Sequence, residues 1–171
     1  FTLQPQLLLA PIRYEDAWPV IIGKMDLTAR FIDLLIISRV TNYRSVDYST
    51  IKNYVFNVTK DIRMADIPTL KRKLRQQYLS LAFDPASALA DLRLNTFTKK
   101  YIKNMLARVT SFIEEQTGVA PNYCNYMNTQ TRNPFEIEHI LTDHYEWFTN
   151  EYADQDDFRR WRNSVGALLL L

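Results

Sequence analysis

The stretch FEIEHILTDH, residues 135–144, decides how the C-terminal part of the chain is expected to fold. Apolar and polar residues alternate with a period of two over 135–140, and that alternation predicts a short β-strand. An acidic, aromatic segment follows, and then a helix that opens at Asp154, where early acidic residues suit the positive helix N-terminus. The closing run VGALLLL, residues 165–171, predicts a turn into a buried second strand.

The first 120 residues have the apolar periodicity of helices instead. Asp66 and Asp84 each stand shortly before a proline, a pattern typical of a helix start. Gly118 can end a helix in the left-handed conformation. Residues 119–134 are rich in asparagine and lack periodicity, which predicts a loop. We therefore expect helices over residues 18–40, 47–63, 66–81, from 84 and over 98–116.

The expected fold class is mainly α, with a helical domain over residues 1–120 and a smaller domain over 121–171. The segment 47–63 leaves an alternative open, because its many β-branched residues also favour a strand. No run approaches the ~20 apolar residues that a membrane helix needs. We therefore expect no membrane partner and a cytoplasmic location.

The composition excludes several classes of protein. Three glycines in 171 residues are too few for a Gly-rich phosphate loop to organise the fold, which excludes a Rossmann or P-loop enzyme within these residues. The single cysteine, Cys124, excludes an internal disulfide and a multi-cysteine zinc site. Two histidines are too few for a three-histidine metal centre.

The net charge of +2 hides an asymmetry along the chain. Residues 1–120 carry 17 Lys and Arg against 11 Asp and Glu, whereas residues 121–171 carry 4 against 8. This split would suit a basic N-terminal part that binds a polyanion and an acidic C-terminal part that binds a cation. Charge also varies by chance over a short segment. The densest basic cluster consists of Lys71, Arg72, Lys73 and Arg75, which predicts either DNA contacts or an ordinary solvated helix face.

Glu138 and His139 stand side by side at the end of the expected first strand. A histidine beside a carboxylate can act as a general base that takes a proton from water. Acidic and amide groups can bind a divalent cation, which stabilises charge on a phosphate. Phosphodiester hydrolysis needs both elements together, but a Glu-His dipeptide on its own more often has a structural role.

The wider pattern resembles a known nuclease family. FEIEHILTDH, the acidic-aromatic spacer and FRRWRNSVGALLLL, residues 158–171, are similar to the HNH (His-Me finger) nuclease domain of GmrSD-like modification-dependent restriction and phage-defence proteins. Residues 11–118 resemble, more weakly, the helical region that joins that family's N-terminal nucleotide-associated domain to its nuclease domain.

The resemblance implies a fold, an activity and partners. The fold would be a helical body followed by a partial ββα-metal (HNH) motif, incomplete at the C-terminus because the chain stops within four leucines. The activity would be that of a bacterial DNA endonuclease that uses Mg²⁺ or Mn²⁺. The partners would be DNA, a nucleotide-associated N-terminal domain of the same protein, and a second copy of the chain. A nucleotide would bind only to that N-terminal domain.

The family's site maps onto four residues of this sequence. His139 matches the general base, and Asn163, 24 residues later, matches the asparagine that orients the histidine. Glu138 and Asp143 match acidic positions and are the expected metal ligands. Ala167 departs from the family, in which Asn is frequent at that position. A further metal ligand is expected on a helix after Leu171, so the 171-residue fragment is expected to be inactive alone.

A rival interpretation comes from a different functional class. The chain could be a non-catalytic helical DNA-binding or protein-interaction scaffold with a degenerate nuclease motif. Ala167 favours this scaffold, whereas the Glu138–His139 pair and Asn163 favour the enzyme.

Overall fold

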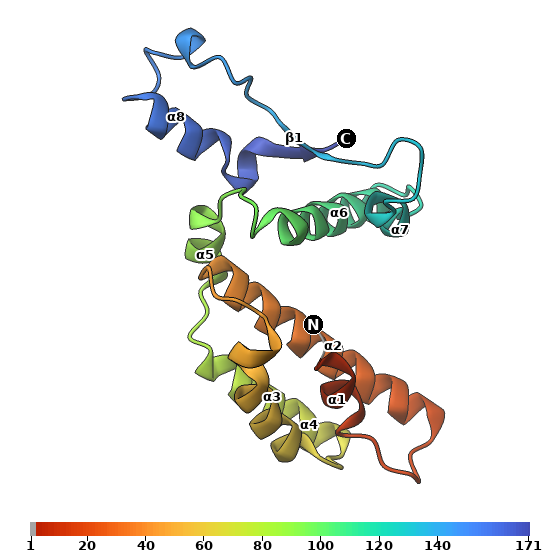
Figure 1. The fold of residues 1–171 in the computed structure, drawn as a ribbon. Helices are drawn as coiled ribbons and strands as arrows, with labels where there is room; N and C mark the ends of the chain where they lie inside the picture. Colours follow the sequence, from red (N-terminus) through yellow and green to blue (C-terminus); the bar gives the residue numbers. More distant parts are fainter. Residues whose placement is uncertain (1–2) are drawn as a thin grey trace. The chain divides into compact units, whose positions relative to one another are not determined.

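The computed structural model describes residues 3–171 and divides the chain into two compact units, Phe1–Ala88 and Leu89–Leu171, each of which is described by itself. The chain is mainly helical with one small two-stranded sheet, which confirms the expected mainly α class (Figure 1). Within residues 3–171 no helix is both long enough and apolar enough to cross a membrane.

The first unit is built from helices that share one apolar core. Its core side chains include Leu7, Phe31, Val55, Ile62 and Leu70, all nearly or fully inaccessible to solvent. Helix α2 packs against α1 and α4, and α3 packs against α1 and α4. The helices are α1 (Gln4–Leu9), α2 (Trp18–Thr41), α3 (Tyr48–Ile62), α4 (Ile67–Ser80) and α5 (Pro85–Asp91), the last of which crosses into the second unit.

Local signals in the sequence explain where these helices begin. The side chain of Asp66 accepts a hydrogen bond from the backbone N–H of Thr69 at 2.8 Å and thereby caps α4, as its position before Pro68 predicts. The hydrogen bonds at Thr69 lower the pKa of the Asp66 carboxyl.

Near the start of α2, the buried Lys24 ammonium donates to the Pro11 carbonyl at 2.9 Å and to Asp16 at 2.6 Å, which fixes the segment between α1 and α2. The bond from Lys24 lowers the pKa of Asp16.

The second unit combines a long helix with the sheet. Its elements are α6 (Lys99–Gln116), α7 (Tyr123–Met127), β1 (Ile137–His139), the 3₁₀ turn η1 (Tyr145–Trp147), α8 (Gln155–Arg162), the 3₁₀ turn η2 (Val165–Ala167) and β2 (Leu168–Leu170). Strand β1 pairs antiparallel with β2, and His139 lies opposite Leu168. The ladder continues beyond both strands, because Glu136 pairs with Leu171 and the Ile140 N–H bonds the Ala167 carbonyl at 2.9 Å.

Three features of the fold differ from the expectations. Helix α1 is an additional helix, and α7 lies within 119–134, the expected loop. The second strand is only partly buried, with Leu168 covered and Leu169 exposed. The structure's compact units divide after Ala88, and the domain boundary expected after residue 120 stays a prediction.

Long-range contacts explain why α6 belongs with the sheet. The Lys103 ammonium on α6 donates to the Phe135 carbonyl just before β1 at 2.5 Å. Helix α7 is anchored to α6 by Tyr126, whose hydroxyl donates to Glu114 and whose ring meets that of Phe135 edge-on at 4.9 Å between centroids. Gly118 follows α6 with φ of 79°, the left-handed conformation expected for it.

Candidate functional site

The structure brings His139 and Asn163 together. His139 is the last residue of β1, and Asn163 is the C-cap residue that directly follows α8. His139 Nε2 lies 2.9 Å from Asn163 Oδ1. Both side chains are partly exposed, so a substrate can reach the imidazole from solvent. Two residues that are 24 positions apart thus form one hydrogen-bonded unit.

Several bonds hold Asn163 in place. Its side-chain Nδ2 donates to the carbonyl of Arg159 at 2.9 Å, one turn back in α8. Its backbone carbonyl accepts from the N–H of Leu94 at 2.7 Å. The neighbouring Arg162 donates from Nε to the carbonyls of Leu141 and Thr142 at 3.1 and 2.9 Å, which ties the chain after β1 to the end of α8. The side chain and the backbone of Asn163 are therefore both held in place by hydrogen bonds.

These bonds determine which nitrogen of His139 is available as a base. Because Asn163 Nδ2 is used by the Arg159 carbonyl, Oδ1 faces the imidazole and can only accept a hydrogen bond. His139 Nε2 must then carry the proton, which leaves the lone pair of Nδ1 free in the neutral ring. An oriented imidazole with a free lone pair can take a proton from water or another acid.

The two expected metal ligands do not join this pair. Glu138 is exposed and, because successive side chains of a strand alternate, it lies on the face of β1 opposite to His139. The side chain of Asp143 is 79% exposed and lies 3.8 Å from His144 Nε2. Across residues 3–171, no three His, Cys, Asp or Glu side chains gather as a metal site requires. Glu138 and Asp143 therefore do not form a metal site together with His139 in the described residues.

A second imidazole–carboxylate pair lies at η1, and no sequence signal beyond its close spacing pointed to it. His144 Nδ1 is 2.8 Å from Glu146 Oε1, and the imidazole stacks on the Trp147 indole with centroids 4.6 Å apart. The Glu146 carboxyl has a lowered pKa because its own backbone N–H and His144 both bond to it. Trp147 is 68% exposed, so this pair is on the surface.

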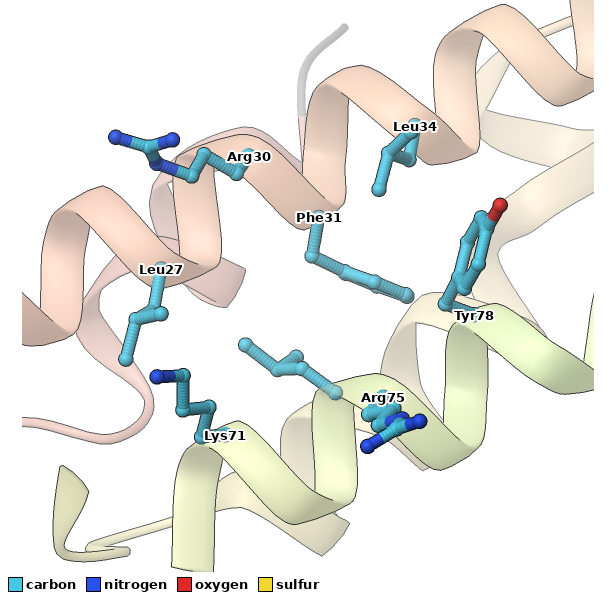
Figure 2. Close-up of a pocket in the computed structure, with 8 residues that line it drawn as sticks. Leu27, Arg30, Phe31, Leu34, Lys71, Arg75 and Tyr78 are labelled. Atoms are coloured by element: carbon cyan, nitrogen blue, oxygen red, sulfur yellow. The ribbon is translucent and has the colours of Figure 1, made fainter. Parts of the chain in front are cut away.

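The basic cluster of α4 is divided by its contacts. Lys73 forms an ion pair with Asp61 at 3.1 Å and also bonds the Asp61 carbonyl. Arg72 is exposed and only approaches Gln76, at 3.5 Å. Lys71 and Arg75 line a groove between α2 and α4 (Figure 2). Within residues 3–171, Lys71, Arg72 and Arg75 form no ion pair.

Comparison with family models, with curated proteins and with solved structures finds no match to this chain.

Proposed function

We propose that this chain contains the general-base part of a DNA endonuclease. His139 would take a proton from the attacking water through Nδ1, and Asn163 would act as a positioning residue that holds the ring by Nε2–H. The observation that carries the proposal is the 2.9 Å bond from His139 Nε2 to Asn163 Oδ1. It supports the proposal because it orients the imidazole, as the resemblance to HNH nucleases implies for a general base.

The proposed step is hydrolysis of a phosphodiester. The water oxygen attacks phosphorus as its proton moves to His139 Nδ1. The bond from phosphorus to the leaving oxygen breaks with its electron pair, and that oxygen takes a proton from solvent. The Asn163 amide oxygen accepts from Nε2–H in both protonation states of the ring, and it stabilises the imidazolium that forms. Since Glu138 and Asp143 do not meet beside His139, dependence on Mg²⁺ or Mn²⁺ rests on the family resemblance alone.

The wider setting of the proposal comes from the same resemblance. In this proposal the protein is a bacterial restriction or anti-phage protein of the cytoplasm, and a nucleotide-associated domain stands N-terminal to this chain. The remaining candidate is a non-catalytic helical scaffold, which the scattered positions of Glu138 and Asp143 favour. A cleavage assay separates the two candidates. The enzyme cleaves DNA and loses this activity when His139 is replaced, whereas the scaffold does not cleave DNA.

Replacing Asn163 tests its positioning role. Asn163→Ala removes the acceptor of Nε2–H, and we expect the cleavage rate to fall by about 10-fold or more. Asn163→Asp keeps an acceptor and should recover much of that loss. Because its carboxylate stabilises the protonated imidazole, the acid limb of the pH–rate profile should move to higher pH. Equal losses in both variants with an unmoved profile would mean that Asn163 only supports the fold.

Replacing the unpaired cations of α4 tests the proposed DNA contacts. Changing Lys71, Arg72 and Arg75 to Gln should weaken binding of all DNA sequences alike and flatten its salt dependence, by about one unit of slope for each phosphate that is no longer neutralised. Lys73→Gln is the matched control, because Lys73 is already paired with Asp61. A fluorescence titration at several salt concentrations measures both quantities. Unchanged affinity and slope would make the cluster a solvated helix face.

A further inference from the structure

An apolar groove runs between α2 and α4 within the first unit. It encloses about 230 Å³ and is open along one side. Leu27, Phe31 and Leu34 reach from α2 toward α4, and Tyr78 stands opposite Leu34 (Figure 2). Leu74 of α4 completes the floor. The groove is lined almost wholly by apolar atoms, so water in it finds few hydrogen-bond partners. Displacement of this water by an apolar side chain would be favourable.

The α4 edge of this groove is positively charged. Helix α4 contains no acidic residue, and its two cations at the groove, Lys71 and Arg75, are one turn apart. Neither forms an ion pair within residues 3–171. On the α2 edge, Arg30 is balanced by Asp26 at 2.9 Å, and its head group points away from α4 (Figure 2). The unbalanced positive charge therefore lies along α4.

We propose that this groove binds an acidic amphipathic helix of a partner protein. Apolar side chains at i, i+3 or i+4, and i+7 of that helix would fill the floor between Leu27 and Leu34. Acidic side chains on its flank would pair with Lys71 and Arg75. The apolar floor and the charged edge thus select the same kind of ligand, one that is apolar on one face and negative beside it.

The apolar floor favours a peptide over a nucleic acid. A phosphate backbone would satisfy Lys71 and Arg75 but would leave the partly exposed Leu27 and Leu34 beside water or charged groups. A helical peptide covers the floor and reaches both cations, which are separated by the i,i+4 spacing of a helix surface. This groove does not include His139, but its cations Lys71 and Arg75 are also among the proposed DNA contacts, so an acidic helix and DNA would compete for them.

The test uses a designed probe with the 171-residue chain. The probe is a fluorescein-labelled peptide of about 15 residues with Leu on one helical face and Glu beside it, and its control has the same composition with the Leu residues scattered around the helix. We expect the designed peptide to bind at least about 10-fold more tightly than the scattered one in fluorescence anisotropy.

Three variants locate the peptide. Leu34→Gln alters the floor and Arg75→Gln alters the charged edge, and each should weaken binding by about 10-fold. Arg72→Gln is the matched control on the same helix, since Arg72 does not line the groove, and it should change affinity less than about 2-fold. Circular dichroism confirms that each variant is folded, and Leu27→Gln repeats the floor test if Leu34→Gln unfolds.

Two results would overturn the proposal. One is equal affinity for the designed and scattered peptides. The other is an equal loss of peptide affinity in Arg72→Gln and Arg75→Gln with no loss in a floor variant, which would mean that the surface binds any polyanion. Displacement of the peptide by a DNA oligonucleotide in that case would identify the surface as a nucleic-acid site. Plasmid cleavage is not measured in this test, so its failure would leave the proposed nuclease untouched.

Discussion

Phe158→Ala is expected to destabilise the second unit by about 3–5 kcal/mol, the usual cost of emptying a buried phenylalanine site. Phe158 is 1% exposed. Its ring lies against Phe148, Tyr152 and Tyr145, with centroid distances of 5.4, 5.3 and 5.7 Å. These three rings come from the acidic-aromatic segment before α8, so Phe158 joins that segment to the helix that carries Asn163.

The measurement is urea unfolding followed by circular dichroism, with Trp161→Ala as the matched control. Trp161 is on the same helix and is also aromatic, but it is 55% exposed, so its loss should cost less than about 1 kcal/mol. Phe158→Ala should also reduce cleavage, because a loosened α8 no longer fixes Asn163 beside His139. Similar stability of the two variants would contradict the role of Phe158 as the centre of this cluster.

Local sequence signals predicted most of the fold. Asp66 and Pro68 marked the start of α4, Gly118 marked the end of α6, and the period-two alternation marked the strand that contains Ile137–His139. The β-branched residues of α3 did not prevent a helix, since Val55, Val58 and Ile62 are buried on one helical face and tertiary packing outweighs propensity.

The remaining features depend on contacts between distant residues. Helix α7 has no periodicity of its own and forms because Tyr126 bonds Glu114 and packs on Phe135. Helix α6 is joined to the chain just before β1 by the bond from Lys103 to the Phe135 carbonyl, 32 residues away. No local pattern contains such information.

The same limit applies to the candidate site. The family resemblance pointed to His139 and Asn163, and the structure places them 2.9 Å apart. The bond from Asn163 Nδ2 to the Arg159 carbonyl, which decides the free nitrogen of the imidazole, has no signature in the sequence. Glu138 and Asp143 were chosen by position along the chain, and strand alternation and exposure separate them from His139 in space.

His139→Ala is expected to lower DNA cleavage by the full-length protein by ~10²-fold or more, the usual contribution of a general base. His144→Ala is the matched control, because His144 is the other histidine, lies on the surface and bonds Glu146 rather than Asn163. It should leave the rate within about 2-fold of wild type. Both variants should retain the circular dichroism spectrum and the unfolding midpoint of the wild-type protein, since neither imidazole lies in the core.

The most direct measurement is a time course of supercoiled plasmid with the full-length protein, in Mg²⁺ or Mn²⁺, with and without EDTA. The account predicts nicked or linear plasmid with the wild type, none with EDTA, and none with His139→Ala over the same period. Metal-dependent cleavage by His139→Ala at the wild-type rate would contradict the account, because the proton of the attacking water would then go to a group other than His139.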